Sequence, residues 1–119
     1  MAKAKILVVD DEQGMRELLS LHLGNAGYDV ITAEDAIVAG HLVVSQKPDL
    51  MLVDMQMPYM NGDEFVTALR GDPSTRDIPV IFLSSDEDVS DRKLGAVAYL
   101  KKPVMADRLL EVVALFIAT

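Results

Sequence analysis

The sequence contains no cysteine and few aromatic residues, which make up 5% of the chain. Without cysteine it can hold neither a disulfide framework nor a cysteine-based zinc site. No apolar run approaches the length of a membrane span, and residues 1–5 lack the apolar stretch of a secretory signal peptide. These absences are typical of a cytoplasmic protein, and we expect this localisation.

Positive charge is also scarce, because 11 Lys and Arg residues face 19 Asp and Glu residues and leave a formal net charge of −8. Such a surface repels phosphate backbones, so we expect no direct binding to nucleic acid or to an anionic membrane. Half of the chain is hydrophobic, which argues against disorder. Its 119 residues predict one domain over residues 1–119, without repeats or linkers.

Short runs rich in Val, Ile and Leu alternate with segments of helical periodicity along the whole chain. Such runs are typical of strands that are buried on both faces of a parallel sheet. We expect strands over residues 6–9, 29–33, 49–54, 79–84 and 96–100, and helices over 13–26, 35–46, 63–70 and 105–118. At most two helical turns fit between Ser84 and Gly95. The fold class is therefore α/β, a single doubly wound sandwich built from βαβ units.

Two features of the expected helices bear on function. In the helix over residues 35–46, the positions available for a buried side are Ile37, Val38, His41, Leu42 and Val44. Both histidines, His22 and His41, fall within helices. A histidine kinase or phosphotransfer function would require an exposed histidine on a four-helix bundle, and this alternating pattern does not build one.

Four of the apolar runs end on residues that are suited to phosphate or metal chemistry. In parallel sheets, ligands bind just beyond the carboxyl ends of the strands, so these residues converge on one edge if their strands are neighbours. They are Asp10, Asp11, Asp54, Ser84, Lys101 and Lys102.

Three carboxylates in one cleft repel each other strongly, so such a site requires a cation. Mg²⁺ suits it, because this ion prefers oxygen ligands and combines one or two carboxylates with phosphate oxygens. A carboxylate such as that of Asp54 can also attack a phosphoryl group and form an acyl phosphate. Lys102 and the Ser84 hydroxyl can bind the phosphoryl oxygens, whereas Lys101 is expected to be a surface charge.

Four segments of the chain resemble the receiver domains of two-component response regulators, of the CheY type. They occur in the family's order and span most of the chain. This resemblance implies a parallel sheet with the strand order 2-1-3-4-5. The matching segments are Val8-Val9-Asp10-Asp11-Glu12, Leu52-Val53-Asp54-Met55-Gln56-Met57-Pro58-Tyr59-Met60-Asn61-Gly62, Leu83-Ser84-Ser85 and Tyr99-Leu100-Lys101-Lys102-Pro103.

The resemblance also assigns roles around the acidic residues. Asp54 corresponds to the phosphoacceptor, which receives a phosphoryl group from a phosphohistidine of a sensor histidine kinase or histidine phosphotransfer protein. Asp11 would bind Mg²⁺ directly and Asp10 through water, while Asp54 and the backbone carbonyl of Gln56 complete the protein ligands. The domain would then catalyse its own phosphorylation and dephosphorylation without being a conventional enzyme.

A second group of roles concerns transmission of the signal. Lys102 matches the family's lysine because it directly precedes Pro103, and the bond between them is often cis in receivers. Ser84 holds the position of the Thr or Ser that moves toward the phosphoryl group, and Tyr99 holds the aromatic switch position. Phosphorylation would draw Ser84 inward and let Tyr99 turn behind it.

One departure from the family concerns the segment between Ser84 and Gly95, which is about four residues shorter than usual and removes roughly one helical turn. A shortened fourth helix would alter the usual partner-binding face. It leaves open an alternative, a pseudo-receiver that binds partners independently of phosphorylation. A haloacid dehalogenase-type phosphatase would require an acid where Gln56 stands, and a flavodoxin-like flavin site would require a hydroxyl-rich loop where Asp10, Asp11 and Glu12 stand.

Overall fold

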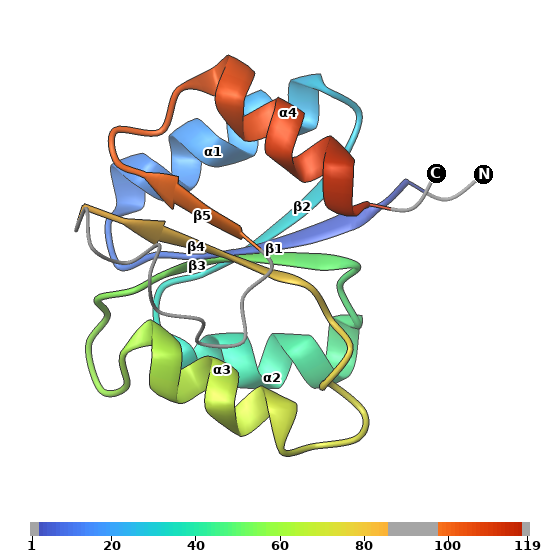
Figure 1. Cartoon of the computed structure of the whole chain (residues 1–119), viewed down its shortest axis with the longest axis vertical. Coiled ribbons are helices and arrows are strands. Elements are labelled where there is room, and N and C mark those ends of the chain that lie inside the picture. The colour runs from blue at the N-terminus through green and yellow to red at the C-terminus, as the bar shows by residue number, and fades with distance from the viewer. Residues whose placement is uncertain (1–2, 86–97, 118–119) are drawn as a thin grey trace.

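A computed structural model of the chain describes residues 3–85 and 98–117, in which helices cover both faces of one parallel sheet (Figure 1). The strands are β1 (Lys5–Val9), β2 (Asp29–Ala33), β3 (Leu50–Asp54), β4 (Val80–Ser84) and β5 (Ala98–Lys101). The helices are α1 (Gln13–Asn25), α2 (Ala36–Gln46), α3 (Gly62–Arg70) and α4 (Ala106–Phe116). The sheet order β2-β1-β3-β4-β5 confirms the expected α/β architecture.

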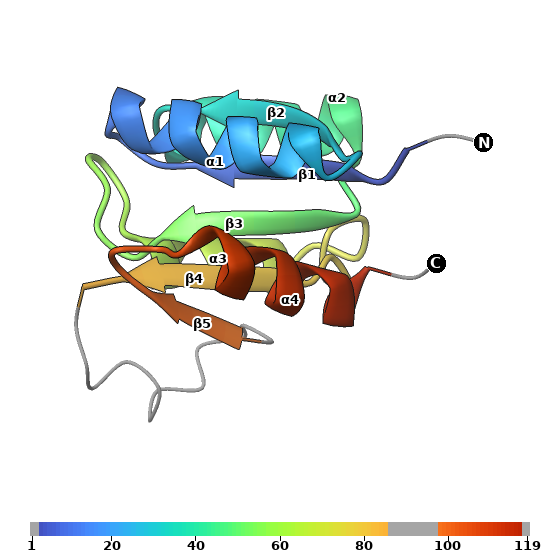
Figure 2. The ribbon, with the colours of Figure 1, turned by 90° about the horizontal axis from the view of Figure 1, so that it is seen from above.

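The central strands are apolar along their whole length because each of their faces packs against a helical layer. Leu7, Val53 and Phe82 belong to a core cluster on the α2 and α3 side, whereas Val8 and Leu52 belong to a second cluster on the α1 and α4 side. Successive strand residues point to opposite faces, so neighbours in the sequence enter different cores. Every pair of neighbouring strands is parallel, so all five strands point the same way and their carboxyl ends share one edge of the sheet (Figure 2).

Local signals fix the ends of the helices. The Asp35 side chain accepts a hydrogen bond from the backbone N–H of Val38 at the start of α2. Asn61 and Glu64 form a capping box that starts α3. Lys47 ends α2 in a left-handed conformation, with φ 48°, directly before a proline that disfavours further helix. Most of the boundaries expected from the sequence are thereby reproduced to within one or two residues.

The expected buried side of α2 is wrong at three positions. Ile37 and Val44 are 58% and 65% exposed and His41 is exposed as well, whereas Ala36, Ala39 and Val43 are buried. Apolar residues occur all around this helix, so its periodicity does not select one face. The structure keeps Val38 and Leu42 packed against the core as expected, but it buries the smaller side of α2 most deeply.

Two other expectations concern the segment between β4 and β5 and the bounds of β5. The proposed shortening of the fourth helix falls mostly on residues 86–97, which lie outside the described residues. β5 begins at Ala98 where the description resumes and extends to Lys101, one residue beyond the expected end. None of the described helices has the length and hydropathy that crossing a bilayer requires.

Candidate functional site

A polar cleft of about 290 Å³ lies at the carboxyl edge of the sheet. The strand order creates it, because β1 and β4 flank β3 on either side and end at the same edge as β5. Residues from four different loops and strand ends therefore reach one space. Its lining consists of Asp11, Glu12, Asp54, Met55, Gln56, Ser84, Ser85 and Lys102.

Asp54 and Lys102 meet in this cleft although 48 residues separate them in the sequence. Lys102 Nζ donates a hydrogen bond to Asp54 Oδ2 over 3.3 Å, and the backbone N–H of Gln56 donates to Asp54 Oδ1 over 3.2 Å. Asp54 itself is only 5% exposed. Burial, assisted by the charge of Asp10, outweighs these favourable contacts and raises the pKa of Asp54 to about 6.

Lys102 is also paired with Asp10, so that one ammonium group contacts two carboxylates. Its Nζ lies 3.3 Å from Asp10 Oδ2 and 3.3 Å from Asp54 Oδ2. Burial alone would lower the pKa of Lys102, but the two carboxylates outweigh that effect and raise it. The lysine is therefore held in its charged form at neutral pH, where it can bind a further anionic group.

Asp10 is completely buried at the end of β1, and its two oxygens differ. Oδ1 accepts a hydrogen bond of 2.9 Å from the backbone N–H of Glu12, whereas Oδ2 is buried and has no hydrogen-bond partner among the described residues. The contact of Oδ2 with Lys102 has the separation of an ion pair but not hydrogen-bond geometry. A buried carboxylate oxygen with unused acceptor capacity is suited to a cation or to an ordered water.

The carboxylates of Asp10, Asp11 and Glu12 place one oxygen each within 4.8 Å of one another and form an acidic group that could hold a metal ion. Asp11 and Glu12 are exposed, and Glu12 lies 3.8 Å from Lys102. Glu12 was not among the metal ligands expected from the sequence, although it directly follows Asp10 and Asp11. Asp54 lines the cleft but is not part of this close group.

The donor set fits a hard divalent cation. It consists of carboxylate oxygens, one of which is buried without a hydrogen bond, and it contains neither sulfur nor imidazole. Arg16, also not expected from the sequence, donates a hydrogen bond of 2.6 Å to the Asp10 backbone carbonyl. This contact fixes the backbone at the turn that carries the acidic group.

The remaining predicted residues occupy different places. Ser84 is 6% exposed and lines the cleft, and its carbonyl accepts a hydrogen bond of 2.7 Å from the Lys102 N–H. Tyr99 does not line the cleft and instead packs against Phe82, with ring centroids 5.8 Å apart. The Lys102–Pro103 peptide bond is cis, as the resemblance implied. Lys101 is exposed outside the cleft.

Comparison with known sequences agrees with this geometry, since the profile of the family described as "Response regulator receiver domain" matches residues 6–114. The chain belongs to this family. It is a receiver domain of two-component phosphorelay signalling, and a role independent of phosphorylation is not favoured. The family assignment rests on almost the whole described chain rather than on the cleft alone.

Several regulators and solved receivers are similar to this receiver domain. It is 37% identical to the phosphate regulon transcriptional regulatory protein PhoB of Pseudomonas aeruginosa over 107 residues, which cover 87% of this chain and 47% of that protein. It is 36% identical to the DNA-binding dual master transcriptional regulator RpaA of Synechocystis, over 89% of this chain and 46% of that protein. The chain thus spans about half the length of these curated relatives.

The fold likewise matches solved receiver structures. The chemotaxis protein CheY4 of Vibrio cholerae superposes with a TM-score of 0.91 and 32% identity, covering 98% of this chain and all of that one. A receiver protein from Pseudomonas putida gives a TM-score of 0.87 at the same identity. These matches confirm the fold and the membership in the response regulator family.

Proposed function

We propose that Asp54 is the phosphoacceptor of this receiver domain and that it takes the phosphoryl group from a phosphohistidine. The observation that carries this proposal is the position of its carboxylate, which lies 3.3 Å from the Lys102 ammonium inside the polar cleft. A nucleophilic carboxylate and a cation for the transferred oxygens are the two protein groups that the reaction needs.

In the transfer, an Asp54 carboxylate oxygen forms a bond to phosphorus as the bond from phosphorus to the histidine nitrogen breaks. The electron pair of the broken bond returns to the imidazole nitrogen, so no further reactant is consumed. Lys102 exchanges part of its contact with Asp54 for a phosphoryl oxygen and stabilises the charge that spreads over the group. Hydrolysis of the resulting acyl phosphate by water resets the domain.

We further propose that the acidic group is a Mg²⁺ site. Asp10, Asp11, Asp54 and the backbone carbonyl of Gln56 would hold the ion, and Glu12 lies close enough to assist. When bound, Mg²⁺ supplies positive charge that offsets the carboxylates and the phosphoryl oxygens. Lys102 provides the countercharge to Asp10 and Asp54 in the structure as it stands.

Ser84 and Tyr99 are proposed as the switch residues. Ser84 is nearly buried at the rim of the cleft, where its hydroxyl can donate to a phosphoryl oxygen. Tyr99 lies one residue before Leu100 on the neighbouring strand and contacts Phe82. A movement of Ser84 toward Asp54 would change the packing next to Tyr99 and carry the local event to another surface.

The partners follow from the family. A sensor histidine kinase or a histidine phosphotransfer protein would deliver the phosphoryl group in the cytoplasm. The curated relatives include transcriptional regulators about twice as long as this chain. The output of the present protein is therefore proposed to depend on whatever effector the phosphorylated domain contacts. We propose that the single domain expected over residues 1–119 does not itself bind nucleic acid.

The proposal is tested by incubating the full chain with acetyl phosphate and Mg²⁺ and following its intact mass. We expect the wild type to gain one phosphoryl group and Asp54→Asn to gain none. Asp29→Asn is the matched control, because Asp29 is an exposed aspartate at the other end of the sheet and should react like the wild type. EDTA should stop the reaction of the wild type and of Asp29→Asn.

Two results would contradict the proposal. Phosphorylation of Asp54→Asn at the wild-type rate would place the acceptor elsewhere. A wild type that stays unmodified by acetyl phosphate, and also unmodified by phosphorylated histidine kinases, would favour a receiver that acts without phosphorylation.

A further inference from the structure

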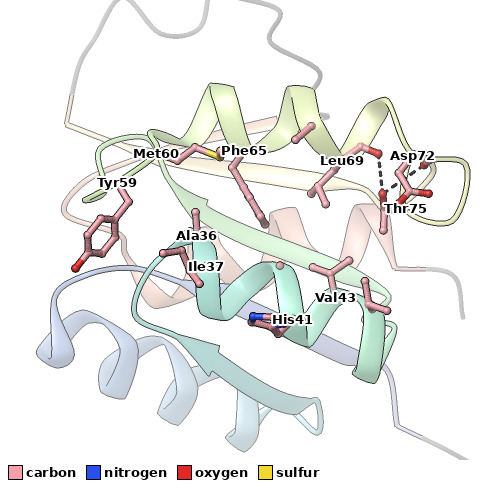
Figure 3. A pocket seen from close by; sticks show the side chains of 13 residues that line it. Ala36, Ile37, His41, Val43, Tyr59, Met60, Phe65, Leu69, Asp72 and Thr75 are labelled. Carbon is pink, nitrogen blue, oxygen red and sulfur yellow. Dashed lines mark hydrogen bonds between the residues drawn. The ribbon is translucent and has the colours of Figure 1, made fainter.

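A second hollow lies between α2 and α3. Its volume is about 490 Å³, within the range of about 300–1,000 Å³ that is typical of small-molecule sites. Figure 3 shows Tyr59 at one end and Asp72 at the other, with His41 along the α2 side. None of its lining residues lines the cleft that contains Asp54, so the two hollows are distinct.

The wall of this α2–α3 groove is largely apolar. Val43, Phe65 and Leu69 form its deeper part and are at most 7% exposed. Ile37 and Val44 line it from α2 while 58% and 65% exposed. Exposed apolar surface beside a concave apolar wall favours an apolar ligand, since burial contributes about 25 cal/mol for each Å² removed from water.

Gly40 keeps the α2 side of the groove open. It occupies an interior position of α2 and lines the groove, and a Cβ added there would meet no atom within 4 Å. Glycine inside a helix costs about 0.5–1 kcal/mol relative to alanine. No close backbone contact requires glycine at this position. The groove is therefore open at a position where almost any other residue would strengthen the helix and fill the space.

Asp72 gives the groove a negative end. Its Oδ1 accepts hydrogen bonds of 2.9 Å from both the backbone N–H and the hydroxyl of Ser74. These bonds hold the pKa of Asp72 below its usual value, so the carboxylate is charged at neutral pH. The nearby Thr75 hydroxyl already donates to the Leu69 carbonyl. Within residues 3–85 and 98–117, no lysine or arginine lines the groove, and its other polar side chains there are His41 and Tyr59.

We propose that the α2–α3 groove binds a small amphipathic amine, with a ring-bearing apolar body between α2 and α3 and its ammonium group at Asp72. The size and apolar wall select a compact organic ligand, and the negative end together with the net charge of −8 selects a cation over an anion. The proposal does not depend on phosphorylation of Asp54.

The test uses 1-naphthylmethylamine as the probe, titrated into the isotope-labelled full chain and followed by amide chemical shifts. We expect the shifts to concentrate in α2, α3 and residues 71–75. 1-Naphthoate has the same ring with a carboxylate and should bind at least about tenfold more weakly. Asp72→Asn keeps the oxygen that accepts from Ser74 but removes the charge, so it should abolish most of the preference for the amine.

Gly40 provides the second arm of the test. Gly40→Leu should fill the groove and weaken binding of the amine by at least about tenfold, whereas Gly40→Ala adds only a methyl group and should retain affinity within about threefold. Thermal melts show that each variant is folded. If Gly40→Leu does not fold, the comparison of amine and naphthoate on wild type and Asp72→Asn decides the question.

Three outcomes would overturn the proposal. They are equal affinity for naphthoate and the amine, unchanged binding in a folded Gly40→Leu variant, and probe-induced shifts confined to the cleft around Asp54. Shifts of the groove that depend on protein concentration without any probe would show that a second copy of the chain covers it, and would also overturn the proposal.

Discussion

The acidic cleft and the α2–α3 groove are built from different parts of the same fold. The cleft lies at strand ends, where four loops bring charged groups together, and Lys102 is paired there with Asp10 and Asp54. The groove lies between two helix surfaces and is lined mainly by apolar side chains. The order of the strands determines which charges meet in the cleft. The shape of the groove depends instead on Gly40, where α2 has no side chain.

The two hollows are nevertheless physically connected through Gly62. This first residue of α3 donates its N–H to the Met55 carbonyl over 2.8 Å, and a Cβ built on it would lie 2.7 Å from the Asp54 backbone oxygen. α3, which forms one wall of the groove, therefore begins in direct contact with the strand end that carries Asp54. A disturbance at this junction should affect both sites, whereas a change within either hollow should remain local.

The largest expected effect is in the cleft. Lys102→Ala should slow phosphorylation by acetyl phosphate by about 10²–10³-fold, the usual cost of losing a group that stabilises transferring charge. Lys101→Ala is the matched control, because Lys101 is an exposed neighbour outside the cleft and its loss should leave the rate within about twofold. Time courses of intact mass measure both rates. Equal losses in the two variants would remove Lys102 from the proposed site.

The next largest effect is expected on stability, at Gly62. Gly62→Ala should reduce the free energy of unfolding by about 1–3 kcal/mol, because its methyl group would collide with the backbone of Asp54 and Met55. Gly14→Ala is the control, since its Cβ meets no atom within 4 Å and should add up to about 1 kcal/mol of helix stability. Urea unfolding distinguishes the two. Equal effects would show that the contact at Gly62 relaxes freely.

A third prediction concerns the buried charge of Asp54, measured with EDTA present. Its pKa in the folded state, about 6, lies above its usual value of 3.8, so ionisation of Asp54 destabilises the fold. Asp54→Asn should be more stable than wild type by about 1–3 kcal/mol at pH 7.5, a range that allows for loss of the Lys102 contact. This difference in the free energy of unfolding should appear as the pH rises from about 4 to about 6, between the pKa values of Asp54 in the unfolded and the folded chain.

The reference for that measurement is Asp29→Asn, which removes an exposed carboxylate and should show little dependence on pH. Unfolding by urea at several pH values provides the data. An advantage of Asp54→Asn that grows as the pH falls would contradict the assignment of a buried, destabilised carboxylate.

The smallest effect belongs to the groove. Gly40→Ala should raise the free energy of unfolding by about 0.5–1 kcal/mol, because alanine loses less conformational entropy in a helix. It should leave phosphorylation unchanged, since Gly40 does not line the cleft. Thermal melts and the acetyl phosphate assay test the two halves of this prediction. A loss of stability would show that the space next to Gly40 is not available to a side chain.

The sequence predicted the central strands and the polar residues at their ends, but it misjudged the faces of α2. An apolar run of Val, Ile and Leu is a local property that indicates a doubly buried strand. α2 is apolar all around, so local pattern could not tell which side chains the core would accept. The core accepted Ala36, Ala39 and Val43 and left Ile37 and Val44 at the groove.

The sequence by itself determined the fold class and the chemical groups of the cleft. An apolar run that forms a buried strand and the polar residue at its end are adjacent in the sequence, so both can be identified from local pattern. Tertiary structure alone decided that Lys102 sits between Asp10 and Asp54, that Glu12 joins the acidic group, and that Asp10 keeps a buried oxygen without a hydrogen bond. It also created the groove beside Gly40. Distances between side chains from separate elements depend on how these elements pack, and short-range sequence patterns do not encode that packing.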